Sequence, residues 1–191
     1  SPSPWLNLPA SFTGEVFGDE VSDPDRVDVS ALVGSMAATT FGRSYLAWHN
    51  YQVAAELHRR LVGDRGDHDF LLVDGFADCA TRVSVALAIT QHAAEQLLHQ
   101  AVALRDRLPQ VAQRLREGRI SPERVIAVIS RTDLIDGADC AAEVDAQIAA
   151  ELDLHDGAWS AERLRDMVDR IVYRHDPDAV RERRRRAVDA R

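Results

Sequence analysis

Histidine is the residue type of this 191-residue chain best suited to acid–base or metal chemistry, and the chain holds seven of them. One, His49, is followed by Asn50, as at the start of a His-Asn-His nuclease centre. That centre is built on two strands and a helix, with further histidine or aspartate ligands close by. The sequence around His49 has helical spacing, no strand signals and no second histidine in register. We therefore interpret His49 as non-catalytic.

Other kinds of catalytic or metal-binding arrangement are missing from the sequence. His92 and His99 share one helical face but lack a carboxylate at ligand spacing. The sequence has no Ser/His/Asp arrangement, phosphate-binding loop or dinucleotide-binding glycine pattern. Cys79 and Cys140 are far apart and have no CxxC partner, which excludes a zinc ribbon. They are predicted to be two buried free thiols, with a single disulfide as the alternative. We expect no catalytic site, metal or cofactor in this chain.

One stretch, Val83–Leu98, has the rhythm of a DNA-binding helix-turn-helix. An alanine-rich helix ends, a tight turn follows, and Thr90 is a good N-cap for a second helix. In such a unit the second helix offers its outer face to the major groove, where glutamine amides can read adenine edges. The residues expected on that face are Gln91, His92, Glu95, Gln96, His99 and Gln100. The alternative is a pair of antiparallel core helices with a solvated Gln/His face.

Charge is strongly segregated along the chain. The net charge is −8, yet residues 82–131 and 179–191 are basic islands in which every cation is arginine. Contacts to phosphate are expected from Arg82, Arg105 and Arg107 in the first island. In the second island they are expected from Arg183, Arg184, Arg185 and Arg186. The alternative for the terminal cluster is a set of salt bridges to the acidic block that precedes it. On the predicted DNA-reading helix, the carboxylate of Glu95 would repel phosphate.

These candidate residues are predicted to lie on helices. Residues 1–28 hold four prolines and no sustained period, so we predict an irregular arm, part of which packs on the body through its apolar residues. Residues 29–191 are predicted to form one all-α domain of about seven to nine helices, with no strand and no internal repeat. The predicted caps are Ser44, Thr90, Ser121 and Ser160. The predicted helices are 29–39, 45–61, 74–88, 91–107, 111–115, 122–132, 138–152, 160–174 and 177–190.

Residues 77–191 contain several short motifs at characteristic spacings from one another. They are Val85–Thr90, Ala101–Leu104, Arg107–Pro109, Leu115–Ser121, and Asp176–Val180 followed by Arg183 and Arg191. This region resembles the N-terminal helical domain, of unknown function, of the actinobacterial 13E12 repeat family. In that family a His-Asn-His (HNH) endonuclease domain usually follows. The resemblance therefore implies a nuclease in the parent protein and supplies no catalytic residue to this chain.

Together these observations lead us to expect a non-catalytic helical domain that targets an HNH-endonuclease-type protein to double-stranded DNA. The alternative is a protein-interaction or dimerisation module that contacts no nucleic acid. In that case the protein could form a homodimer. The acidic majority favours the alternative, and the two basic islands favour DNA. No apolar run approaches the ~20 residues of a membrane span, and no signal peptide is recognisable, so we expect a cytoplasmic protein with no membrane partner.

Overall fold

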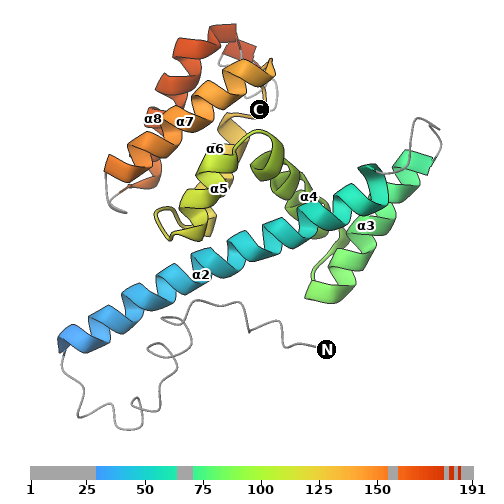
Figure 1. The fold of residues 1–191 in the computed structure, drawn as a ribbon, viewed down its shortest axis with the longest axis horizontal. Helices are drawn as coiled ribbons and strands as arrows, with labels where there is room; N and C mark the ends of the chain where they lie inside the picture. The colour runs from blue at the N-terminus through green and yellow to red at the C-terminus, as the bar shows by residue number, and fades with distance from the viewer. Residues whose placement is uncertain (1–28, 64–70, 155–158, 179–180, 183–184, 186–191) are drawn as a thin grey trace.

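A helix of 30 residues, α2 (Val29–His58), runs along one side of the molecule and ends in a π-helical turn, η4 (Arg59–Gly63) (Figure 1). The computed structural model describes residues 29–63, 71–154, 159–178, 181–182 and 185, and these residues form helices and short connections without a strand. The predicted all-α domain is therefore confirmed. The predicted N-terminal arm, residues 1–28, lies outside the described residues.

The prediction of two helices separated near Ser44 is wrong, because α2 continues through this point. Ser44 is fully buried, and its Oγ donates to the carbonyl oxygen of Thr40 at 3.2 Å instead of capping a new helix. A glycine such as Gly42 costs about 1 kcal/mol inside a helix. Tertiary packing outweighs this penalty, since α2 packs against four later helices, α3 to α6.

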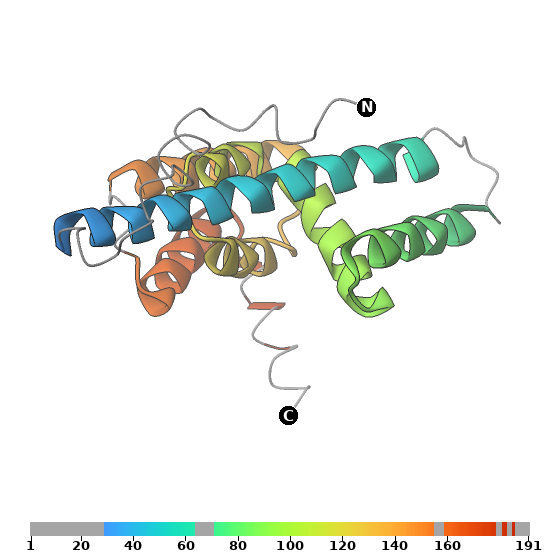
Figure 2. The ribbon, with the colours of Figure 1, turned by 90° about the horizontal axis from the view of Figure 1, so that it is seen from below.

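The next two helices form a hairpin beside the C-terminal part of α2 (Figures 1 and 2). They are α3 (Leu71–Leu87) and α4 (Gln91–Asp106). The turn between them places Ala88 at a positive φ of 53°, a conformation that glycine usually supplies. Thr90 caps α4 as predicted, since its side chain accepts a hydrogen bond from the backbone amide of Ala93. The tight turn expected of a helix-turn-helix is thus present, with alanine at its strained position.

Four further helices complete the fold on the other side of α4. They are α5 (Pro109–Arg116), α6 (Pro122–Arg131), α7 (Ala138–Leu154) and α8 (Ala161–His175). Ser121 and Ser160 cap α6 and α8 as predicted. The helix predicted at 177–190 is described only in part, and its described residues, 177, 178, 181, 182 and 185, are helical. Among the described helices, none combines the length and apolar character that crossing a bilayer requires.

One apolar core joins these helices. α5 packs against α7, and α6 packs against α8, so that α5 and α6 lie between α2 and the last two helices. The largest fully buried side chains come from α4 to α8 and include Leu98, Leu104, Leu115, Ile148 and Leu164. Both cysteines are free thiols, as predicted, but only Cys79 is buried, whereas Cys140, also predicted to be buried, is half-buried. The core therefore leaves the outer faces of α4, α6 and α8 available for ligands.

Candidate nucleic-acid interface

The predicted DNA-reading face of α4 is partly engaged inside the protein. Gln91 is exposed but bonds the carbonyl oxygen of Ala77 on α3 and the carboxylate of Glu95, both at 3.4 Å. Gln100 accepts a hydrogen bond from the hydroxyl of Tyr51 on α2 at 2.8 Å. His92 and Gln96 are exposed to solvent. The face predicted from sequence therefore exists, but only part of it can meet a partner without giving up internal contacts.

Several of these side chains line a cavity between α4 and α6. The cavity has a volume of about 330 Å³. Its polar lining comes from Gln96, His99, Gln100, Arg107, Ser130 and Asp133, with Ala103, Ile126 and Ile129 as its apolar lining. Four predicted site residues, Gln96, His99, Gln100 and Arg107, are thus brought together. They line a concave site, whereas a major-groove reader presents a convex helix.

The three arginines predicted from the first basic island are occupied by internal partners. Arg82 pairs with Asp78 at 2.9 Å, and both side chains are well exposed. Arg105 pairs with Asp106 at 2.6 Å and donates to the carbonyl oxygen of Ala55 on α2. These hydrogen bonds with Asp106 raise the pKa of Arg105. Such exposed pairs are worth at most about 1 kcal/mol, so Arg82 in particular can exchange its partner for a phosphate.

Arg107 is held more deeply. Its guanidinium donates to the carbonyl oxygen of Ile129 at 3.0 Å, and burial lowers its pKa, an effect that the carboxylate of Asp133 opposes. Its Nε atom is buried and has no hydrogen-bond partner among the described residues. Arg107 is therefore placed to serve the α4–α6 cavity and cannot reach outward to a DNA backbone.

The predicted terminal cluster is mostly outside the described part of the chain. Arg183, Arg184 and Arg186 fall there. Arg185 is exposed and pairs with Glu182 at 3.0 Å. The neighbouring Arg181 pairs with Asp178 at 2.9 Å. Arg181 thus pairs with the last acid of the acidic block of residues 132–178, whereas Arg185 pairs with an acid of its own island.

A second cavity, between α6 and α8, gathers arginines that the sequence prediction did not single out. This α6–α8 groove has a volume of about 570 Å³. Its lining consists of Ser121, Glu123, Arg124, Ala127, Ser130, Arg131, Ala161, Leu164 and Arg165. Both serines and all three arginines offer hydrogen-bond donors. Glu123 is the single acid in this lining, so the groove has the composition of an anion-binding site.

Two acids in or beside this groove, Glu123 and Asp169, already have arginine partners. Arg43 on α2 pairs with Glu123, and Arg131 pairs with Asp169 on α8. Hydrogen bonds from its own backbone amide and from the Ser121 hydroxyl, together with Arg43, hold the pKa of Glu123 below its ordinary value. Arg124 and Arg165 have no acidic partner among the described residues. The groove therefore carries two uncompensated positive charges.

A repeated pattern in the sequence is the signal that points to these arginines. Residues 121–131 read Ser-Pro-Glu-Arg-Val-Ile-Ala-Val-Ile-Ser-Arg, and residues 160–170 read Ser-Ala-Glu-Arg-Leu-Arg-Asp-Met-Val-Asp-Arg. Both begin with a capping serine and place arginines three and ten residues later. The prediction of no internal repeat overlooked this similarity. Arg165 was overlooked for another reason, because it lies in a segment whose net charge is acidic.

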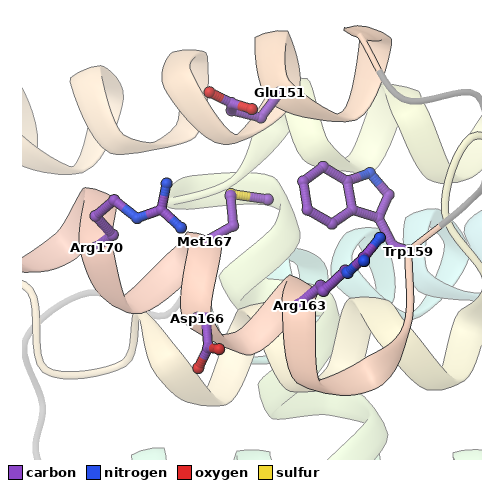
Figure 3. Close-up of a pocket in the computed structure, with 6 residues that line it drawn as sticks. All are labelled: Glu151, Trp159, Arg163, Asp166, Met167 and Arg170. Atoms are coloured by element: carbon purple, nitrogen blue, oxygen red, sulfur yellow. The ribbon is translucent and has the colours of Figure 1, made fainter.

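The second arginine pair of this pattern lines a third cavity, between α7 and α8 (Figure 3). Trp159 and Met167 form its apolar part, and Arg163 and Arg170 extend along α8 on either side. Two acids, Glu151 and Asp166, also line it. Its charges balance, so this cavity is a weaker site for a phosphate than the α6–α8 groove.

His49 is half-buried on α2 and lines a cavity with Glu56 and Arg60, and no second histidine is among the described residues that line it. In the part of the chain that the structure describes, no group of three or more His, Cys, Asp or Glu residues is placed to hold a metal ion.

Comparison with known proteins places most of the chain in one family. The family described as "Domain of unknown function (DUF222)" matches residues 46–191. Two uncharacterized proteins from two strains of Mycobacterium tuberculosis are each 30% identical over 186 residues, covering 94% of this chain and 32% of the relative. An uncharacterized protein in the est 3' region of the same species is 29% identical over 175 residues, which is 88% of this chain and 48% of the relative. The chain thus spans about a third of the length of the first two relatives. No solved structure matches it.

Proposed function

This chain belongs to the DUF222 family, and from that premise we propose that it is a non-catalytic module that binds the backbone of double-stranded DNA. The observation that carries the proposal is the α6–α8 groove, where Arg124 and Arg165 have no acidic partner among the described residues. Arginine matches a phosphate bidentately and remains charged at every relevant pH. The nearby acids, Glu123 and Asp169, already have arginine partners and repel an approaching phosphate less than bare carboxylates would.

The wider setting of the module is also part of the proposal. The resemblance to the 13E12 repeat family implies an HNH endonuclease domain in the parent protein, and the first two relatives extend well beyond the third of their length that the chain matches. We therefore propose that the module brings such a nuclease to DNA. Two free thiols fit a reducing compartment, which supports a cytoplasmic location.

The test is fluorescence anisotropy of a labelled duplex at salt concentrations between roughly 50 and 200 mM. In the wild-type protein, affinity should fall steeply as salt rises, because each phosphate contact releases counterions. The double variant Arg124→Ala/Arg165→Ala should bind every sequence more weakly. Its slope of log affinity against log salt should be smaller by about 2, one for each lost phosphate contact.

A matched control separates the groove from net charge alone. The double variant Arg59→Ala/Arg60→Ala also removes two positive charges, but from η4, where both arginines pair with Glu56. This control should leave the affinity and the salt slope unchanged. Equal weakening by the two double variants would show that only overall charge matters, and the α6–α8 groove would lose its role.

The terminal cluster provides a further variant. Replacing Arg183, Arg184, Arg185 and Arg186 by Ala should weaken binding on all sequences alike, since phosphate contacts position a protein without specifying a sequence. If this variant abolishes binding while the Arg124/Arg165 variant has no effect, the DNA-binding surface lies at the C-terminal end and not in the groove.

A protein-interaction or dimerisation module is the second candidate, and one observation favours it. The N-terminal turns of α2 project from the body (Figure 1) and carry an apolar stripe of Val29, Val33 and Met36. These side chains are 76%, 60% and 72% exposed. A light-scattering measurement of molar mass tests this candidate. A dimer that Val33→Glu/Met36→Glu converts to a monomer, in a protein that fails to bind DNA, would establish it in place of the DNA-binding module.

A further inference from the structure

The α4–α6 cavity combines donors, acceptors and apolar walls in one concave site. Gln96 and His99 are exposed at its rim, whereas Gln100 and Arg107 are half-buried. Ile126 and Ile129 contribute apolar atoms from α6. Ligand sites of proteins characteristically have an apolar lining with a few convergent polar groups. This arrangement is therefore suited to a small, flat, polar group with apolar faces. A phosphate backbone alone would make no contact with the apolar lining.

Two of the polar groups are fixed in orientation by the protein. The hydroxyl of Tyr51 donates to Oε1 of Gln100 at 2.8 Å. Burial and the carboxylate of Glu123 raise the pKa of Tyr51 to about 12, so this hydroxyl keeps its proton and remains a donor. With its oxygen engaged, Gln100 has its Nε2 amide left to donate. The guanidinium of Arg107 is anchored by the carbonyl oxygen of Ile129.

An acceptor lies in the same lining as these fixed donors. Asp133 is exposed, its charge partly opposes the lowering of the Arg107 pKa by burial, and it supplies carboxylate oxygens. The Nε of Arg107 is buried without a partner among the described residues, which leaves one strong donor to be satisfied. The edge of a nucleobase carries donors and acceptors side by side, and its faces are apolar enough to lie against isoleucine.

The position of the cavity relates it to the α6–α8 groove. Ser130 on α6 lines both sites, so α6 is a ridge with the arginine groove on one flank and the α4–α6 cavity on the other. A DNA backbone held in the groove would therefore pass within one helix width of the cavity. Paired bases present their edges within the stack and cannot enter a concave site, whereas an unpaired base can rotate out of the stack.

We propose that the α4–α6 cavity binds a single unpaired nucleobase of DNA whose backbone lies in the α6–α8 groove. This inference rests on the proposed function, since it requires the backbone to be bound there. It makes bulged or otherwise distorted duplexes the preferred partner of the module. The amides of Gln96 and Gln100, expected from sequence to read the major groove, here contact an extruded base.

The test compares the anisotropy of three labelled duplexes of the same sequence: fully paired, with one unpaired base, and with an abasic residue at that position. The abasic duplex has the flexibility of the bulge but lacks the base. The wild-type protein should bind the duplex with an unpaired base roughly tenfold more tightly than the other two, which is the effect of one good bidentate contact. Gln96→Ala and Asp133→Asn, both at exposed positions, should reduce this preference.

The control variant is Gln110→Ala, which removes an exposed glutamine outside the cavity and should keep the full preference. Equal binding of all three duplexes, weakened by Arg124→Ala/Arg165→Ala, would overturn the cavity proposal and retain the backbone-binding function. Equal preference for the unpaired base and the abasic residue would also overturn it, because flexibility alone would then explain the preference. No binding to any duplex would overturn the proposed function itself, and the cavity proposal with it.

Discussion

A single buried carboxylate on α7 completes the N-terminus of α5. Asp145 is 1% exposed, and its two oxygens accept from the backbone amides of Gln110 and Val111 at 2.8 and 3.0 Å. The N-cap residue of α5, Leu108, has no side-chain acceptor. Burial raises the pKa of Asp145, and the two amide hydrogen bonds oppose that shift. Asp145 thus takes the place of a local cap through a tertiary contact.

We predict that Asp145→Ala lowers the free energy of unfolding by about 2–4 kcal/mol, because two amides lose their acceptor. Urea denaturation measures this change. Asp145→Asn keeps one acceptor oxygen and should lose less. A loss of under ~0.5 kcal/mol in the Ala variant, the usual range for a neutral surface change, would show that Asp145 does not support α5.

We predict that His58, at the end of α2, makes stability depend on pH. Burial and the charge of Arg105 lower its pKa below 6.5, and its Nδ1 is buried without a hydrogen-bond partner among the described residues. As pH falls below 6.5, the unfolded chain takes up the proton first. The stabilisation present above that pH is therefore lost as pH falls through the folded-state pKa. His58→Gln should reduce the drop in Tm between about pH 7.5 and 5.5, whereas the exposed His92→Gln should not. Identical pH profiles for His58→Gln and the wild type would contradict this assignment.

At the scale of elements, a glycine lets the α5–α6 connection approach α2. Gly118 has a φ of +70°, and a Cβ added there would lie 2.5 Å from Cδ2 of Phe41. Gly137, before α7, has a φ of +86° with nothing within 4 Å of an added Cβ. A side chain at either position would be strained, because the backbone is in the left-handed region. Only at Gly118 would the side chain also clash with a neighbour.

We therefore predict different costs for the same substitution. Gly137→Ala should destabilise the protein by about 1–2 kcal/mol through backbone strain alone. Gly118→Ala should cost more, because Phe41 or the turn must also move. Thermal or urea denaturation of the two variants gives the comparison. Equal losses would mean that α2 and the turn accommodate the methyl group freely.

At the scale of the whole molecule, the described cavities are lined by charged and apolar side chains. We predict that the pure chain does not cleave plasmid DNA with magnesium, manganese or zinc, because no described cluster of His, Cys, Asp and Glu can hold a metal. Agarose-gel assays with each metal check this. Metal-dependent cleavage that disappears in His49→Ala would contradict the prediction and assign chemistry to the His49-Asn50 pair.

The sequence by itself determined the fold class and most helix boundaries. Thr90, Ser121 and Ser160 cap the helices predicted to begin after them, because a capping side chain acts on amides only two or three residues away. The exception was the interruption near Ser44. There the local signals of Gly42 and Ser44 were outweighed by packing against helices far along the chain, a term that local sequence does not contain.

Tertiary structure alone decided the candidate site, because charge balance depends on which residues meet. Arg43 meets Glu123 80 residues later, and Arg131 meets Asp169 38 residues later. The net charge of the segments that hold these residues does not predict which arginine pairs with which acid. Among the described residues, Arg165 has no acidic partner although it lies within an acidic segment, whereas Arg105, in a basic island, pairs with Asp106. Electrostatic attraction falls with distance in space and not in sequence, so only the packing of α6 on α8 shows where positive charge remains.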